Sequence, residues 1–396
     1  MRDVYIVAAK RTPLGRFGGS LTPFSAADLA AHAMQATLDQ AGVAGDKLDL
    51  YILGNVLRAG HGQLIPRQAA LKAGIPETVD GYAIDMVCSS AMMSVINGML
   101  AIRSDEADLV LTGGTESMSQ TGFYLSHRAR WGYKFLLGAP ENLTDLLLHD
   151  GLTDSTSGEG MGEQTERLAA DHGFTRKALD EVASVSQQRA AAATQAGHFQ
   201  SEIAPIIIKS RKETVELASD EGIQDGTTPE SLAKLRPAFT KDGVLTAGNC
   251  SQITDGAATI LLASGDAVEK YGLTPLAKVL GGSWAGGTPC RFPEVPIYAT
   301  QKLMKKLGKT VTDFDLFENN EAFSVSNLLF EKLLDVPREK LNVHGGAIAL
   351  GHPIGASGAR IIITLLYTLQ QRELTSGLAA LCHGTGGGTA LAFERV

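Results

Sequence analysis

The chain of 396 residues is predicted to fold as an α/β protein made of two similar units with a third region inserted. Three observations predict this fold. Short apolar runs alternate with helical patterns over residues 1–118, the same alternation recurs over 272–396, and charged helical stretches replace it over 119–244. Because residues 245–271 return to the first pattern, we expect three domains: 1–118 with 245–271, then 119–244, then 272–396.

The first unit alternates strands with helices. Strands are predicted at residues 5–9, 50–53, 84–87 and 108–112, where short apolar runs end in turn-forming residues. Ser25 is a candidate N-cap for a helix over 26–41, and further helices are predicted over 66–73 and from Cys88 onward. This alternation is typical of an α/β sheet.

The inserted region and the second unit follow. Helices are predicted over residues 164–170 and 175–196 of the insertion, and a strand over 254–263 returns to the first unit. In the second unit we expect strands at 276–280, 314–319, 378–381 and 390–393, and helices over 297–307 and 359–370. Residues 314–319 echo residues 50–55, which indicates a coarse duplication of one unit.

The composition is that of a folded soluble protein with two or three domains. Hydrophobic residues make up 44% of the chain and charged residues 20%. With 35 Lys and Arg against 43 Asp and Glu, the net charge is −8, which disfavours binding to nucleic acid or to an anionic membrane.

The four cysteines are scattered and form no C-x-x-C pair, so we expect neither a zinc site nor a disulfide framework. The sequence shows no signal peptide and no apolar span of about 20 residues. A cytoplasmic protein without a bound metal is therefore expected.

Cys88 is the first candidate catalytic residue. It lies at the predicted strand-to-helix junction, where the free amides and the positive end of a helix dipole favour a thiolate. Ser89, Ser90 and Ala91 follow it and are small enough to admit a substrate close to the backbone. From this stretch alone two interpretations stay open, a nucleophile or a buried structural cysteine.

Three later stretches, residues 318–323, 345–358 and 382–388, combine polar or reactive side chains with glycine. In the second, His352 stands between Gly351 and Pro353, and Ser357 is a candidate cap for the next helix. In the third, Cys382 ends one predicted strand and another strand follows, whereas a phosphate-binding loop needs a following helix.

Taken together, these stretches resemble the thiolase family over essentially the whole chain. Seven motifs occur in the family's order: Arg11-Thr12-Pro13, the Cys88 stretch, Gly113-Gly114-Thr115-Glu116-Ser117-Met118, Thr246-Ala247-Gly248-Asn249-Cys250-Ser251, Asn320-Glu321-Ala322-Phe323, Gly351-His352-Pro353 and Cys382-x-Gly384. The resemblance implies a thiolase-like α/β fold, in which two duplicated halves carry mixed five-stranded sheets and layered helices, with an inserted loop domain.

The resemblance also implies roles for five residues. Cys88 takes the acyl group from a thioester, and His352 activates Cys88 and, with a water held by Asn320, stabilises an oxyanion. Cys382 is the second acid/base, and the amides of Cys88 and Gly384 form a second oxyanion hole. Apart from the family pattern, an ordinary buried histidine is the alternative for His352.

The inserted domain resembles the one that binds coenzyme A in this family, with acetyl-CoA as a substrate and no tightly bound cofactor. The expected substrate-binding residues are Leu152, Met161, Ser231, Leu232, Ser251, Phe292 and Phe323. Ordinary loop or core packing is the alternative for these side chains.

Four departures from the family pattern bear on the acyl-chain preference. Gly160 replaces a histidine common before Met161, and Gln224 replaces an arginine near the coenzyme A site. Phe292 replaces a methionine of the acyl pocket, and His383 replaces an aliphatic residue after the acid/base cysteine.

The resemblance thus implies a CoA-dependent acyltransferase. It would condense two acetyl-CoA molecules reversibly to acetoacetyl-CoA and CoA, by a ping-pong route through acetyl-Cys88. One alternative is a degradative 3-ketoacyl-CoA thiolase for longer chains. An alternative of another class is a non-catalytic protein that binds acyl-CoA or lipid, against which the complete catalytic set argues. A β-ketoacyl synthase would pair its cysteine with two His, or with His and Asn, whereas the late partner here is Cys382.

The expected partners are acyl-CoA substrates and further copies of the chain, as a dimer or a tetramer, without nucleic acid or membrane. Residues 121–137 are rich in aromatic side chains and resemble the loop that joins two dimers in tetrameric members. Exposed aromatic clusters suit an interface, and packing on the same subunit is the alternative.

Overall fold

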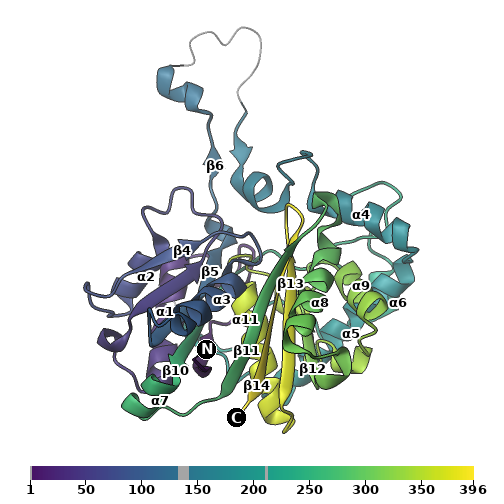
Figure 1. Cartoon of the computed structure of the whole chain (residues 1–396). Coiled ribbons are helices and arrows are strands. Elements are labelled where there is room, and N and C mark those ends of the chain that lie inside the picture. The colour runs from purple at the N-terminus through teal and green to yellow at the C-terminus, as the bar shows by residue number, and fades with distance from the viewer. Residues whose placement is uncertain (1, 133–141, 210–212) are drawn as a thin grey trace.

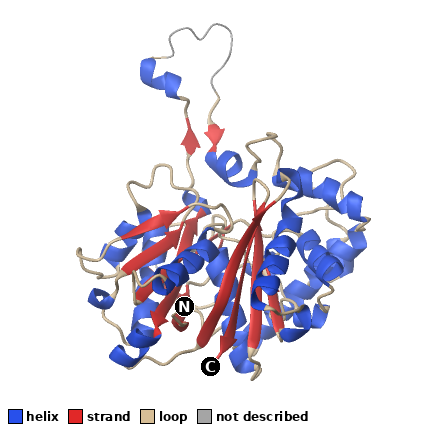
Figure 2. Ribbon diagram, in the orientation of Figure 1, coloured by secondary structure: helices blue, strands red, loops and turns tan. Residues whose placement is uncertain are grey.

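A mixed sheet runs through the whole protein (Figures 1 and 2). The computed structural model describes residues 2–132, 142–209 and 213–396. Neighbouring strands of the sheet follow in the order β12 (Leu316–Asn319), β13 (Ser376–His383), β14 (Gly387–Arg395), β11 (Ala277–Gly286), β1 (Val4–Arg11), β10 (Thr254–Ser264), β5 (Leu109–Ser117), β3 (Leu50–Gly54) and β4 (Gly81–Ile84), while β2 (Gly15–Arg16) pairs with β10.

The sheet is a duplication about the pair β1 and β11. In one half β3 is parallel to β5, and β5, β10 and β1 follow antiparallel; β12, β13, β14 and β11 repeat these directions in the other half. β1 and β11 join the halves through Tyr5 opposite Lys278 and Ile6 opposite Ala277. A parallel bridge between Phe317 and Leu341 takes the place that β4 holds beside β3.

The α/β fold class is therefore confirmed, with one difference in detail. The two expected five-stranded sheets are fused into one, and the outermost strand of the second half is reduced to a bridge. The domain boundaries expected from the sequence stay predictions.

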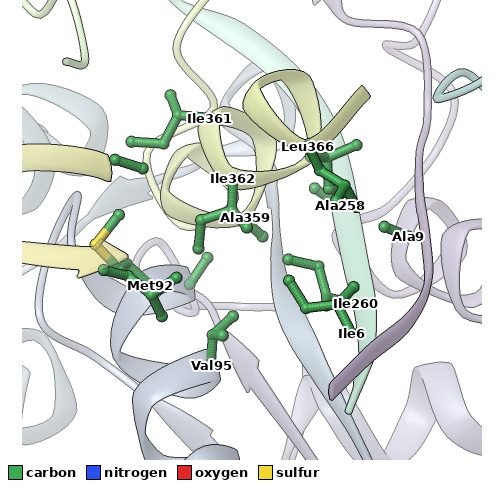
Figure 3. Close-up of a cluster of buried hydrophobic side chains, with 14 of the residues drawn as sticks. Ile6, Ala9, Met92, Val95, Ala258, Ile260, Ala359, Ile361, Ile362 and Leu366 are labelled. Atoms are coloured by element: carbon green, nitrogen blue, oxygen red, sulfur yellow. The ribbon is translucent and has the colours of Figure 1, made fainter. Parts of the chain in front are cut away.

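Two helices, α3 (Ser90–Arg103) and α11 (Ser357–Gln371), pack against each other on one face of the sheet. Figure 3 shows the core that they form with β1 and β10, in which Met92 of α3 lies near Ile362 of α11. Gly358 allows the close contact, because a Cβ there would lie 2.3 Å from the backbone nitrogen of Met92. The first turns of the two helices therefore meet.

The other face is covered by α1 (Ala26–Ala41), α2 (Ile65–Lys72) and α7 (Gly265–Tyr271) in the first half, and by α8 (Val295–Leu307) and α9 (Ser324–Leu334) in the second. Alternation along β5 explains the two layers, since Val110 packs with α3 whereas Leu109 and Leu111 pack with α1. The predicted cap of the first helix is confirmed: Ser25 and Asp28 form a capping box at α1.

The inserted region lies mainly beside the second half (Figure 1). It contains α4 (Met161–His172), α5 (Arg176–Gln195), α6 (Pro229–Leu232) and the antiparallel pair β8 (Ile206–Lys209) and β9 (Thr214–Leu217). A second pair, β6 (Phe123–Tyr124) and β7 (Thr144–Asp145), forms an arm that projects from the body. Buried Arg11 ties the insertion to β1 through ion pairs with Glu202 and Asp220.

Short helical segments complete the fold. They are η1 (Gly45–Lys47), η2 (Met118–Gln120), η3 (His127–Trp131), η4 (Leu147–Leu152), η5 (Pro289–Glu294), η6 (Val311–Asp313), η7 (Arg338–Lys340) and α10 (Ala347–Leu350). Among the described residues, no helix has the length and apolar character that crossing a membrane requires.

Candidate active site

Cys88 lies in a tight turn between β4 and α3. The strand expected over residues 84–87 ends at Ile84, and the helix expected from Cys88 begins only at Ser90. Val87 adopts a positive φ of 48°, which a β-branched residue rarely does, and such strain is typical of functional sites. The Ser90 hydroxyl stabilises the turn, because it accepts from the Met86 amide (2.8 Å) and donates to the Val87 carbonyl (2.6 Å).

The thiol of Cys88 is almost fully buried, with 3% of the residue exposed. Burial raises its pKa to about 12, although a hydrogen bond from the backbone of Gly384 opposes the rise. The expectation of a lowered pKa at a helix N-terminus was therefore wrong for the free enzyme. Burial removes the water that would stabilise the thiolate, and the nearby backbone amides do not compensate for this loss.

Cys382 and Gly384 bring the end of β13 to the turn that carries Cys88. Cys382 is 1% exposed, and burial together with the nearby Cys88 raises its pKa. The amide of Gly384 donates to the sulfur of Cys88, so residues 382–384 of the second half contact the reactive turn of the first. The Thr389 hydroxyl adds a second link, since it donates to the Ser89 hydroxyl at 3.0 Å.

His352 lies in the loop that precedes α11. Its amide donates to the Gln252 carbonyl (3.2 Å) and the Thr254 hydroxyl (3.0 Å), and its Nδ1 lies 2.5 Å from the Ser357 hydroxyl. Because that hydroxyl donates to the Pro353 carbonyl (2.9 Å), Nδ1 carries the ring proton and Nε2 is left as an acceptor. The expected helix cap at Ser357 was wrong: this side chain orients His352 instead.

Asn320 follows β12 and contacts the same imidazole. Its Nδ2 lies 3.4 Å from Nε2 of His352, and its Oδ1 accepts from Nη2 of Arg360 at 3.4 Å. Arg360 is fully buried and lies 3.6 Å from the Glu318 carboxylate. Burial first, and the Arg360 charge second, lower the pKa of His352 to about 3, which keeps the imidazole neutral near pH 7.

The two catalytic loops meet at glycines. A Cβ on Gly54, at the end of β3, would lie 2.6 Å from both the Ala91 nitrogen and the Gly355 carbonyl oxygen. The loop of His352 and the first turn after Cys88 therefore contact the same strand end. Parallel strands place their carboxyl ends at one edge of a sheet, where α/β proteins bind ligands.

A cavity of about 540 Å³ opens beside this edge. It is lined by Val56, Arg58, Ala59, Asp85, Val87, His149, Asp150, Gly151, Thr153, Ser155, Met161, Gly384 and Thr385. Two candidate residues, Met161 and Gly384, contribute to its wall. A Cβ at position 384 would lie 3.6 Å from the Met161 sulfur, so glycine leaves this wall open.

The expected substrate-binding residues separate into two groups. Met161, Phe292 and Phe323 belong to one hydrophobic cluster with Cys382, and the rings of Phe292 and Phe323 pack edge to face at 6.2 Å. Leu152 packs on the cluster that contains Cys88. Of the expected set, Met161 lines the cavity. Leu232 packs with Ala183 and Ile348, exposed Ser231 completes the capping box of Thr228 at α6, and half-buried Ser251 donates its amide to the Ala322 carbonyl.

The departures from the family pattern have local structural roles. Gly160 is the N-cap of α4 and donates its amide to Glu163 at 3.2 Å. The amide of Gln224 donates to Gln187 at 2.8 Å. The His383 ring lies against Gly387, and its Nδ1 is 2.7 Å from the Gly384 carbonyl.

Three residues near the site were not assigned a role from sequence: Ser357 as a histidine partner, Arg360 and Glu116. Arg360 stands in an apolar run of the sequence and Glu116 in a glycine-rich one. A charged residue in such a run is often buried and paired with a specific partner, so this pattern could have identified both. Within the described ranges, no group of three or more His, Cys, Asp or Glu side chains is placed to hold a metal ion.

Two family domains match the chain. The thiolase N-terminal domain matches residues 4–266, and the thiolase C-terminal domain matches residues 273–395. An acetyl-CoA acetyltransferase of Synechocystis sp. is 80% identical over 396 residues, which cover 100% of both chains.

Solved structures agree with this similarity. Human mitochondrial 3-ketoacyl-CoA thiolase superposes with a TM-score of 0.96 at 40% identity, covering 100% of this chain and 99% of that one. A thiolase from Ascaris suum in complex with coenzyme A superposes with a TM-score of 0.92 at 38% identity, covering 100% of both.

Proposed function

The chain belongs to the thiolase family, and from this premise we propose how its residues perform the acetyl transfer. It is an acetyl-CoA C-acetyltransferase, which condenses two acetyl-CoA molecules to acetoacetyl-CoA and CoA. One observation carries the assignment of residues. The Thr389 hydroxyl donates to the Ser89 hydroxyl at 3.0 Å, and Gly384 and Val87 line one cavity, so the second half meets the turn that carries Cys88.

In the first half-reaction, Cys88 attacks the carbonyl carbon of acetyl-CoA. Nε2 of His352 is free to take the thiol proton, since Nδ1 is held by Ser357. The imidazolium then returns this proton to the leaving CoA sulfur, and acetyl-Cys88 remains. The amides of Cys88 and Gly384 stabilise the oxyanion that forms on the acetyl oxygen.

In the second half-reaction, Cys382 removes a proton from the methyl group of a second acetyl-CoA. A water that accepts from the Asn320 amide donates to the enolate oxygen and to Nε2 of His352, and the carbanion attacks the carbonyl carbon of acetyl-Cys88. The carbon–sulfur bond then breaks, acetoacetyl-CoA leaves, and the released Cys88 thiolate takes up the proton held by Cys382. In the cleavage direction Cys382 returns the proton. Its raised pKa suits that step, because it keeps Cys382 in the thiol form before it donates.

Coenzyme A is proposed as substrate rather than as a resident cofactor, and the solved complex of the Ascaris relative with coenzyme A supports this proposal. Short acyl chains are proposed as the preferred substrates, since Met161 lines the cavity and bulky Phe292 belongs to the same hydrophobic cluster as Met161 and Cys382. A degradative 3-ketoacyl-CoA thiolase for longer chains is the second candidate, because the human relative of that name is 40% identical.

The catalytic roles are tested by acetylating two variants with radiolabelled acetyl-CoA. Cys88→Ser should retain no label, whereas Cys382→Ser should form the labelled acyl-enzyme but condense about 10²–10⁴-fold more slowly. Equal labelling of both variants would contradict the assigned roles. The same assay separates a catalytic protein from one that only binds acyl-CoA, which would retain no covalent label even as wild type.

We propose further that the protein is a cytoplasmic homotetramer, or a dimer, assembled in part through the arm of β6 and β7. Phe123 is 65% exposed and Trp131 is 68% exposed, and such apolar surface suits an interface. Tyr133 and Phe135 of the same aromatic stretch lie outside the described residues. Light scattering at micromolar concentration tests this proposal, and a monomer would contradict it.

A further inference from the structure

Glu116 is a buried carboxylate with no role in the proposed chemistry. It lies near the carboxyl end of β5, in the glycine-rich motif of residues 113–118, and is 0% exposed. A buried carboxyl group, protonated or ionised, requires specific partners, because its lost hydration must be replaced by hydrogen bonds. The partners of Glu116 therefore indicate what it does.

Four N–H donors converge on this carboxylate. Oε1 accepts from Asn55 Nδ2 (2.8 Å) and the Leu57 amide (3.1 Å), while Oε2 accepts from the Val56 amide (3.1 Å) and the Gly355 amide (3.0 Å). Residues 55–57 follow β3, and Gly355 belongs to the loop that begins at His352. One side chain thus joins the ends of two strands to the loop that carries the proposed base.

The backbone around Gly355 leaves little freedom. A Cβ on Gly114 would lie 1.9 Å from the Gly355 oxygen, and a Cβ on Gly355 would lie 2.6 Å from the Thr115 oxygen and 2.7 Å from Glu116 Oε2. The loop of residues 352–356, here called the histidine loop, therefore lies in a narrow slot formed by Gly54, Gly114 and Glu116. The same Gly54 abuts the first turn after Cys88.

We propose that Glu116 is a positioning residue that sets the place of His352 relative to Cys88 by holding Gly355 in this slot. The inference rests on the roles proposed above for Cys88 and His352. Displacing a reacting group by about 1 Å lowers a rate about 10²-fold, so loss of this anchor should slow catalysis without changing substrate affinity.

Glu116→Gln is the principal variant. Glutamine keeps the length of the side chain but turns one oxygen into an NH₂ group, which faces N–H donors in either orientation. We expect kcat to fall about 10²-fold, KM for acetoacetyl-CoA to stay unchanged, and acetylation of Cys88 to slow in a single turnover.

The matched control is Asp49→Asn. Asp49 accepts from the amides of Asp108 (2.8 Å) and Leu109 (2.9 Å), and so joins β3 to β5 at their other ends. This variant should lose stability and keep the kcat of wild type. A merely structural role for Glu116 predicts the same pattern for Glu116→Gln, and that result would overturn the inference.

The direction of the change in acetylation rate at high pH distinguishes positioning by Glu116 from a purely electrostatic role. Burial raises the pKa of Glu116 to about 8, so the group is ionised at pH 9, where its charge opposes formation of the Cys88 thiolate. If Glu116 acted only through that charge, Glu116→Gln would acetylate faster than wild type at pH 9. Slower acetylation at pH 7 and pH 9 alike supports positioning, and faster acetylation at pH 9 refutes it.

If Glu116→Gln fails to fold, a second variant tests the same proposal. Gly355→Ala leaves Glu116 intact but places a methyl group against Thr115 and Glu116, which should push the histidine loop outward and slow acetylation in the same way. An unchanged acetylation rate in folded Gly355→Ala overturns the inference. Failure of the proposed function would appear separately, as wild-type protein that forms no acetyl-Cys88.

Discussion

The two halves of the sheet share their strand directions, but the asparagines that follow corresponding strands have different partners. Asn55 directly follows β3, and Asn320 directly follows β12. Asn55 donates to Glu116 and to the Thr115 carbonyl, so it is bound into the backbone framework, whereas Asn320 faces His352. Duplication therefore supplies the scaffold twice, while Asn55 anchors the backbone in one half and Asn320 faces the proposed base in the other.

The paired helices α3 and α11 show the same division. Each begins beside a catalytic loop, with Cys88 before α3 and His352 before α11. α3 exposes Leu100, whereas α11 is buried from Ser357 to Leu369 and carries the buried charge of Arg360. The proposed nucleophile thus lies in a tight buried turn, while the proposed base lies beside a buried cation that helps to hold it neutral.

The largest effect should follow from removing the base of the second half. We expect His352→Ala to lower kcat about 10²–10⁴-fold, the usual range for a general base. His344→Ala is the matched control, since His344 is also buried and has a lowered pKa but contacts Thr368 and His198. Steady-state kinetics of both variants tests this, and equal losses would erase the distinction between the two histidines.

The next effect concerns the buried charge of α11. Arg360→Leu leaves the Glu318 carboxylate without its cation, so we expect a loss of about 3–5 kcal/mol in the free energy of unfolding. Leu100→Ala on the exposed side of α3 should change stability by less than about 0.5 kcal/mol. Urea denaturation measures both, and similar midpoints would show that the two helices do not differ as described.

The reactive turn of the first half is tested by the pH dependence of alkylation. Iodoacetamide reacts with thiolates, and the pKa of Cys88 is raised to about 12 by burial. The rate of inactivation should therefore rise about tenfold per pH unit between pH 7 and pH 10, and acetyl-CoA should protect. Peptide mapping identifies the site, with Cys88→Ser as control; a plateau below pH 9 would indicate that the thiolate is stabilised after all.

The smallest effect concerns specificity at the cavity. Acetoacetyl-CoA should be the best cleavage substrate of the wild type. Phe292→Ala should raise kcat/KM for the six-carbon relative to the four-carbon 3-ketoacyl-CoA about tenfold, because binding one methylene in an apolar pocket is worth about 1–3 kcal/mol. Phe314→Ala removes an equally buried ring that packs on Phe317, and it should leave the chain-length profile unchanged. If the wild type instead cleaves 3-ketoacyl-CoA of eight or ten carbons best, the protein is a degradative 3-ketoacyl-CoA thiolase and the proposed short-chain preference is wrong.

The sequence by itself determined the fold class, the order of the elements and the family. Local patterns sufficed for these, because the apolar run of β1 and the capping box at α1 each span only a few neighbouring residues. It also predicted Cys88, His352, Asn320 and Cys382 as the catalytic set, since each stands in a motif that resembles the thiolase family. That set now awaits the labelling experiment.

Only the tertiary structure decided the protonation and the anchoring of these groups. The pKa of Cys88 depends on how much water reaches its sulfur, and burial reverses the effect expected from the helix end. Ser357 serves His352 rather than the helix, and Glu116 meets Gly355 from 239 positions away in sequence. Glu116 and Gly355 come together only when the loop of His352 packs onto the first half, because no local pattern records which distant donor will replace the water that a buried carboxyl group has lost.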